Sequence, residues 1–93
     1  MKPLETNGEE ALALSALVWT LSDAGRADRL LSLTGLTPDD LRAGTQDRGM
    51  LAAVMSFLEA HEPDLISCAR VLEVPPLALV EARRRLEGAG LDS

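Results

Sequence analysis

Apolar residues recur at helical spacing along most of the chain, and capping residues, glycines and prolines separate the segments. The first segment runs from Asn7 to about Leu21, with Glu10 following Asn7 in a capping-box arrangement. Its main stripe, at i, i+3, i+4 and i+7, comprises Leu14, Leu17, Val18 and Leu21. A second apolar face comprises Leu12, Ala16 and Trp19. So wide an apolar surface predicts a central helix, or one shared with a partner.

Two short helices are predicted next. Asp23 is the cap of the first of them, and Gly35 is its stop signal. Ala27, Leu30 and Leu31 are expected to face inward, while the residues expected to face water are Arg26, Asp28 and Arg29. The next helix has Thr37 at the N-cap, Pro38 at its first position and acids in its first turn, and Gly44 ends it.

Three further helices complete the pattern. Asp47 is the predicted cap of the fourth helix, whose apolar stripe comprises Leu51, Val54, Met55 and Leu58. Pro63 is placed at the first position of the fifth helix, whose shared face comprises Leu65, Cys68, Ala69 and Leu72. Pro75-Pro76 breaks the chain, and the last helix runs roughly from Leu77 to Glu87 before Gly88 or Gly90.

A weak internal repeat is visible. Residues 33–41 align with residues 71–79, 38 positions further along the chain. Each copy holds a helix end, a tight apolar turn, a proline start and an inward leucine. The repeat is also consistent with no more than two similar helix–turn–helix corners.

These signals predict an all-α fold: a compact orthogonal bundle of five to six short helices with two helix-turn-helix-like corners, packed around the first and fourth helices. Residues 1–6 are expected to be a disordered lead-in, 7–90 a single helical domain and 91–93 a tail.

Composition narrows the class of protein. Trp19 and Phe57 are the only aromatic residues among 93, so the core must consist of aliphatic side chains. The net charge of −6 argues against a general binder of nucleic acids or of anionic membranes. Cys68 is the only cysteine, which rules out an intramolecular disulfide and fits a cytoplasmic protein. The uncharged run 11–21 follows acidic residues, so a signal peptide is not expected, and the run is too short to cross a bilayer.

The segment His61-Glu62-Pro63-Asp64 is the candidate functional or fold-defining corner. His61 is the only histidine, and two acids flank it. Zinc usually takes three or four protein ligands, more than this segment supplies alone. The structural interpretation places His61 in the last turn of one helix and Asp64 in the first turn of the next, where a carboxylate meets free N–H groups. We therefore expect no metal, no cofactor and no catalytic residue.

Two further motifs have competing interpretations. Cys68 is a possible nucleophile, but its place on an apolar stripe favours burial. The segment 66–79 resembles a DNA-binding helix–turn–helix, with Arg83-Arg84-Arg85 on the second helix. Recognition contacts usually come from the start of that helix, which here is uncharged, and cations near its end simply stabilise it.

Several of these segments together resemble a known family. They are Trp19, residues 29–36, Asp40-Leu41-Arg42, Phe57-Leu58 and residues 61–65. Over about residues 9 to 87 the chain resembles a small bacterial family catalogued as domain of unknown function 3572 (DUF3572). The resemblance implies a compact helical cytoplasmic protein of bacterial origin with no assigned activity.

The function that fits best is non-enzymatic: a protein-interaction or regulatory domain that binds an unknown protein partner or forms a homodimer. The alternative is a nucleic-acid-binding helix–turn–helix protein, and the third possibility is an enzyme or metal site around His61. The candidate interface comprises Leu12, Ala16, Trp19, Met50 and Phe57, beside the main stripes of two helices. The surface there is wide for so small a domain, unless the second, third and sixth helices cover it.

Overall fold

The computed structural model describes residues 8–45 and 47–88, and these form six helices with no strand among them. The helices are α1 (Gly8–Leu21), α2 (Ala24–Thr34), α3 (Pro38–Ala43), α4 (Arg48–Glu59), α5 (Glu62–Leu72) and α6 (Pro76–Gly88). The all-α prediction is confirmed. The predicted lead-in, the Asn7 cap, Gly90 and the predicted tail lie outside the described residues. None of the described helices is both long and apolar enough to cross a membrane.

Local capping sets several of these boundaries, as the sequence predicts. The Asp23 carboxylate accepts a hydrogen bond from the Arg26 amide at 2.9 Å, which starts α2. Thr37 and Asp40 form a reciprocal capping box at the start of α3. Asp47 accepts from two amides at the start of α4. Each cap satisfies backbone donors that have no partner within the helix.

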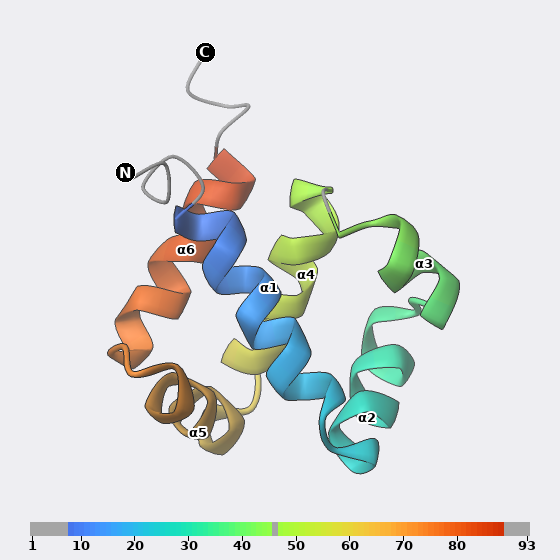
Figure 1. Ribbon diagram of the computed structural model, residues 1–93, viewed down its shortest axis with the longest axis horizontal. Helices are drawn as coiled ribbons and strands as arrows, with labels where there is room; N and C mark the ends of the chain where they lie inside the picture. The colour runs from blue at the N-terminus through green and yellow to red at the C-terminus, as the bar shows by residue number, and fades with distance from the viewer. Residues whose placement is uncertain (1–7, 46, 89–93) are drawn as a thin grey trace.

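The two central helices, α1 and α4, cross in the middle of the molecule (Figure 1). On one side of this crossing lie α5 and α6, and on the other lie α2 and α3. The predicted α4 stripe is confirmed, since Leu51, Val54, Met55 and Leu58 are all buried. The centre is wider than predicted, because α6 packs on both α1 and α4 and buries Leu79, Ala82 and Leu86.

The buried face of α1 differs from the predicted stripe. Its buried residues are Ala13, Ala16, Leu17 and Thr20. Val18 is 68% exposed and Leu21 is 41% exposed, so the chain itself covers only part of the predicted stripe. Small side chains let α1 lie close to its neighbours, and the Thr20 hydroxyl is satisfied by donating to the Ala16 carbonyl at 2.8 Å.

The internal repeat extends well beyond the two corners. Helices α2 and α5 occupy residues 24–34 and 62–72, the same span shifted by 38 positions. The same shift relates the ends of α1 and α4, at Leu21 and Glu59, and the starts of α3 and α6, at Pro38 and Pro76. The repeat therefore covers a unit of three helices, with α6 longer than α3.

The packing of the two units is reciprocal. Helix α2 packs on α4 of the other unit, as α5 packs on α1. Glu10 and Arg48, which occupy equivalent positions, form an ion pair with each other at 2.7 Å. Exchange of the two units therefore maps the contacts of their first and middle helices onto one another, as an approximate twofold axis does. The third helices differ, because α6 packs on α1, α4 and α5, whereas α3 packs far less extensively on the equivalent helices.

One arginine fastens three helix ends to one another. Arg48, at the start of α4, donates to the Glu10 and Glu9 carboxylates on α1 and to the Arg85 carbonyl on α6. A hydrogen bond with its own backbone lowers the pKa of Glu9, and Arg48 lowers it further, against the opposing effect of burial. These hydrogen bonds hold together the starts of α1 and α4 and the last turn of α6.

The two corners use the same left-handed turn with different residues. Gly35 ends α2 at φ 77°, and the equivalent Glu73 ends α5 at φ 62°. Glycine adopts this conformation freely, whereas a residue with a Cβ pays about 1–2 kcal/mol for it.

We therefore expect Glu73→Gly to stabilise the protein by about 0.5–1 kcal/mol. Glycine relieves the strain of the left-handed conformation, and its larger entropy in the unfolded chain offsets part of that gain. Urea unfolding followed by circular dichroism measures the change. Glu73→Ala, which keeps the Cβ, should have little effect. Loss of stability in Glu73→Gly would contradict this account of the corner.

Candidate functional site

The predicted corner at His61 is a junction between helices. His61 is the exposed N-cap of α5, and its side chain makes no capping hydrogen bond. The prediction that it lies in the last turn of the preceding helix is wrong, because α4 ends at Glu59. Pro63 is the second residue of α5, and the exposed Glu62 is the first. No group of three or more candidate metal ligands occurs among the described residues.

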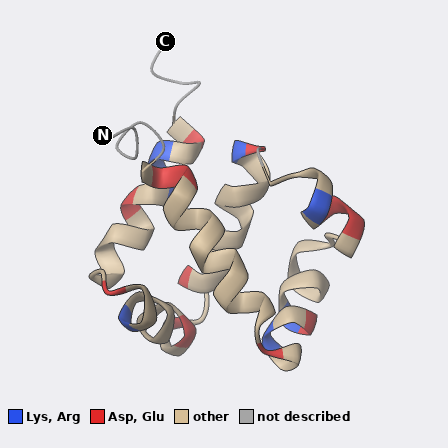
Figure 2. Cartoon of the chain, in the orientation of Figure 1, with Lys and Arg blue, Asp and Glu red and all other residues tan. Residues whose placement is uncertain are grey.

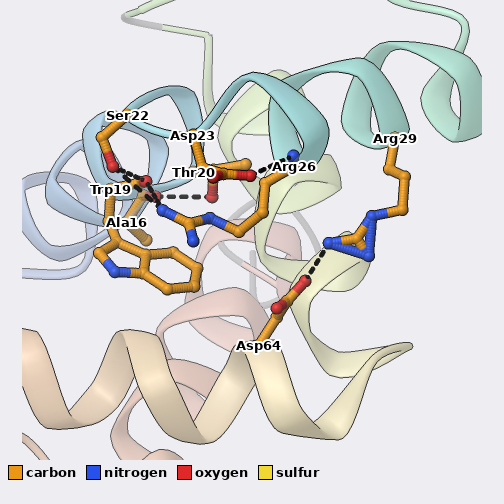
Figure 3. Close-up of polar contacts among 8 residues, drawn as sticks. All are labelled: Ala16, Trp19, Thr20, Ser22, Asp23, Arg26, Arg29 and Asp64. Atoms are coloured by element: carbon orange, nitrogen blue, oxygen red, sulfur yellow. Dashed lines mark hydrogen bonds and ion pairs between the residues drawn. The ribbon is translucent and has the colours of Figure 1, made fainter.

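Asp64 makes a polar contact with a residue far away in the sequence. It lies in the first turn of α5, as predicted, but its carboxylate points to α2 and accepts a hydrogen bond from Arg29 at 2.7 Å (Figure 3). The Asp64 side chain is 15% exposed and that of Arg29 is 43% exposed. Arg29 therefore does not simply face water, as predicted, but joins α2 to α5.

A second arginine of α2 lies against the aromatic ring of α1. The Arg26 guanidinium stacks over the Trp19 ring, 3.7 Å from its centre, and donates to the Trp19 carbonyl at 2.8 Å (Figure 3). It also donates to the Ser22 hydroxyl at 3.0 Å. The prediction that Arg26 faces water is corrected by these contacts. No carboxylate of the described residues forms an ion pair with its guanidinium, which is held instead by the ring, the carbonyl and the hydroxyl.

Beside this stacked pair lies an apolar hollow between α1 and α5, which we call groove A. It has a volume of about 430 Å³ and is lined by Leu14, Ser15, Val18, Trp19, Ser22, Val71 and Leu72. None of these residues is charged. Val71 is 60% exposed and Val18 is 68% exposed, while Trp19 is half-buried.

A matching hollow, groove B, lies between α4 and α2. It has a volume of about 480 Å³ and is lined by Leu33, Thr34, Ala53, Ser56, Phe57 and Ala60. A shift of 38 positions carries each of these residues onto a residue that lines groove A. The two grooves are therefore equivalent sites of the repeated unit. A third hollow lies between α3 and α4, but its only charged lining residues, Asp40 and Asp47, already cap those helices.

The five predicted interface residues divide between core and surface. Ala16, Met50 and Phe57 are 0%, 7% and 5% exposed, so these three lie in the core of the chain itself and are not available as surface. Leu12 is half-buried against that core, and Trp19 lines groove A. Sequence reasoning missed Val71 because it lies next to the end of α5, where too few residues follow to show a helical pattern. The repeat relates Val71 to Leu33, but the exposure of Leu33 is known only from the structure.

The corner that resembles a DNA-binding motif is formed by α5 and α6. Its Arg83 is half-buried and paired with Glu59 of α4 and with Glu87, the latter at 2.6 Å. The hydrogen bond to Glu59 raises the pKa of Arg83 further above its ordinary value. This arginine therefore serves as a link between α6 and α4.

A family model described as "Protein of unknown function (DUF3572)" matches residues 7–89. The chain belongs to this family. The resemblance carried by residues 9–87 is thereby confirmed. No curated protein and no solved structure matches the chain.

In this DUF3572 protein, Cys68 lies inside the fold. It is fully buried on the inner face of α5, as its place on the apolar stripe predicted. Burial raises the pKa of the thiol to about 11, with a smaller opposing effect of Arg26. A thiol that stays protonated at neutral pH is a poor nucleophile.

We expect Cys68 to react with a thiol reagent such as DTNB at least about a hundredfold more slowly in the native protein than in denaturant at pH 8, because its pKa is about 11. Stability should also fall as the pH rises above about 8.5, since the unfolded thiol ionises first. Stopped-flow absorbance measures the rates. Equal rates in the two states would show that the thiol is accessible.

The Arg29–Asp64 contact should contribute to stability. We expect Asp64→Ala to lower the free energy of unfolding by about 1 kcal/mol, because the pair is partly shielded from solvent. The matched control is Asp39→Ala, which breaks the exposed pair with Arg42 and should cost less than about 0.5 kcal/mol. Urea unfolding compares them, and equal losses would assign Asp64 no special role.

Proposed function

We propose that this DUF3572 protein is a non-enzymatic protein-interaction domain and that groove A is its contact surface. The observation that carries the proposal is the exposure of Val18 and Val71, at 68% and 60%, on the rim of an uncharged groove that contains Trp19. Tryptophan is enriched at the energetic centres of protein interfaces, where one part of the ring is packed and another is accessible.

The surroundings of groove A favour a protein partner over a solvated surface. The chain carries no charged residue from Ala11 to Ser22, and Figure 2 shows most of α1 as an uncharged strip across the middle of the molecule. The charged positions coloured in this view lie mostly away from that strip. Full burial of a valine side chain is worth about 1.5–3 kcal/mol, so covering both valines would favour association.

The placement of the two candidate catalytic groups supports a role without catalysis. His61 is exposed at the N-cap position of α5 without a capping hydrogen bond, and Cys68 is buried with a raised pKa. The nucleic-acid alternative gains no support, because Arg83 is held by two carboxylates and the net charge is −6. A cytoplasmic location belongs to the same proposal, and the single cysteine supports it.

A photoreactive residue in place of Ser15, an exposed residue that lines groove A, tests the proposal in native cells. We expect a covalent protein adduct at this position, with a yield reduced about tenfold or more by Val71→Asp, because the carboxylate would lose its water in the interface.

The matched control carries the photoreactive residue at Ala53, the equivalent position in groove B. A second control carries it at Ser32, an exposed residue of α2 outside both grooves. The proposal is contradicted if the adduct yield at Ser15 is no higher than the yield at Ser32. Circular dichroism establishes that each variant is folded, which is expected because Val71 is exposed.

A further inference from the structure

We infer that groove A is occupied by a second copy of the same chain, with the α1 helices of the two copies packed antiparallel about a twofold axis near Ser15. The inference rests on the proposed function, because it takes groove A as the contact surface. It names the partner that fits this groove best.

The surface of α1 is complementary to itself. Val18 projects from the helix at 68% exposure, and the exposed residues on the same side are the small Ala11, Ser15 and Ser22. In an antiparallel pair centred near Ser15, Val18 of each copy lies opposite the Ala11 end of the other. A projecting side chain and the space for it are thus present on the same surface, as a twofold interface requires. Small side chains at the crossing allow the two helices to approach closely.

The absence of charge on this face and the helix dipoles also fit an antiparallel pair. No charged residue lies between Ala11 and Ser22, so no like charges meet when two copies of this face pack together. The dipoles of the two α1 helices are opposed in an antiparallel pair, which favours it over a parallel one.

Groove B lacks the features of groove A that favour such a contact. Ser56 stands at the position of Val18, and Ala52 stands at the position of Leu14, so groove B has no projecting apolar residue from its central helix. The repeat therefore supplies a second groove of the same origin that lacks the projecting valine.

Sedimentation of the purified full chain over micromolar to millimolar concentrations is the first test. We expect a concentration-dependent dimer of twice 9.9 kDa, shifted at least about tenfold toward monomer by Val18→Asp. The matched control is Leu33→Asp, which places the same charge on an exposed residue of groove B and should leave the dimer unchanged. A dimer that survives Val18→Asp, or a chain that stays monomeric throughout, overturns the inference.

Crosslinking fixes the geometry of the contact. In a Cys68→Ala background, Ser15→Cys should be joined to its counterpart by a short bismaleimide, because both lie near the axis. Ala53→Cys, its equivalent in groove B, should remain uncrosslinked. A crosslink at Ala53→Cys instead would place the interface at groove B and overturn the assignment.

The same experiments separate this inference from the proposed function. If the chain is monomeric and its Ser15 photoadduct contains a different protein, the second copy is the wrong occupant and groove A remains a contact surface. If neither a dimer nor an adduct forms, both proposals fail.

Discussion

The close crossing of α1 and α4 is the constraint on which the rest of the structure depends. Ala13 and Ala16 of α1 are fully buried, and so are Leu51 and Val54, at the equivalent positions of α4. A helix that contributes alanines to a crossing can lie near its neighbours, but it places its larger side chains elsewhere. Val18 and Leu21 are therefore left toward solvent, and the apolar rim of groove A follows from the way the core is packed.

The repeat explains why two grooves exist and why they differ. Each unit packs its middle helix on the first helix of the other unit, which forms one groove for each pair. Packing keeps the equivalent positions buried in both units, as at Leu30 and Cys68. Surface positions are under no such constraint, so Val18 in one unit corresponds to Ser56 in the other. The two sites therefore share a shape and differ in chemistry.

The polar contacts join elements that the apolar core leaves less firmly attached. Arg29 joins α2 to α5, Arg83 joins α6 to α4, and Arg48 joins the ends of three helices. Arginine suits this role because its planar group can donate to several acceptors at once. All three arginines are thus engaged within the chain.

The sequence by itself determined the helical class, most helix boundaries, the α4 stripe and the burial of Cys68, because caps, turn residues and periodicity act within a few residues. The similarity of residues 33–41 and 71–79 also indicated the repeat. Only the tertiary structure decided which face of α1 is buried, where Arg29 and Arg83 find their carboxylates and which apolar residues stay exposed. Those outcomes depend on which helices meet, since a side chain on a wide apolar face is covered only where a neighbour lies over it. Periodicity shows which residues of one helix share a face, but it does not show which other helices pack against that face.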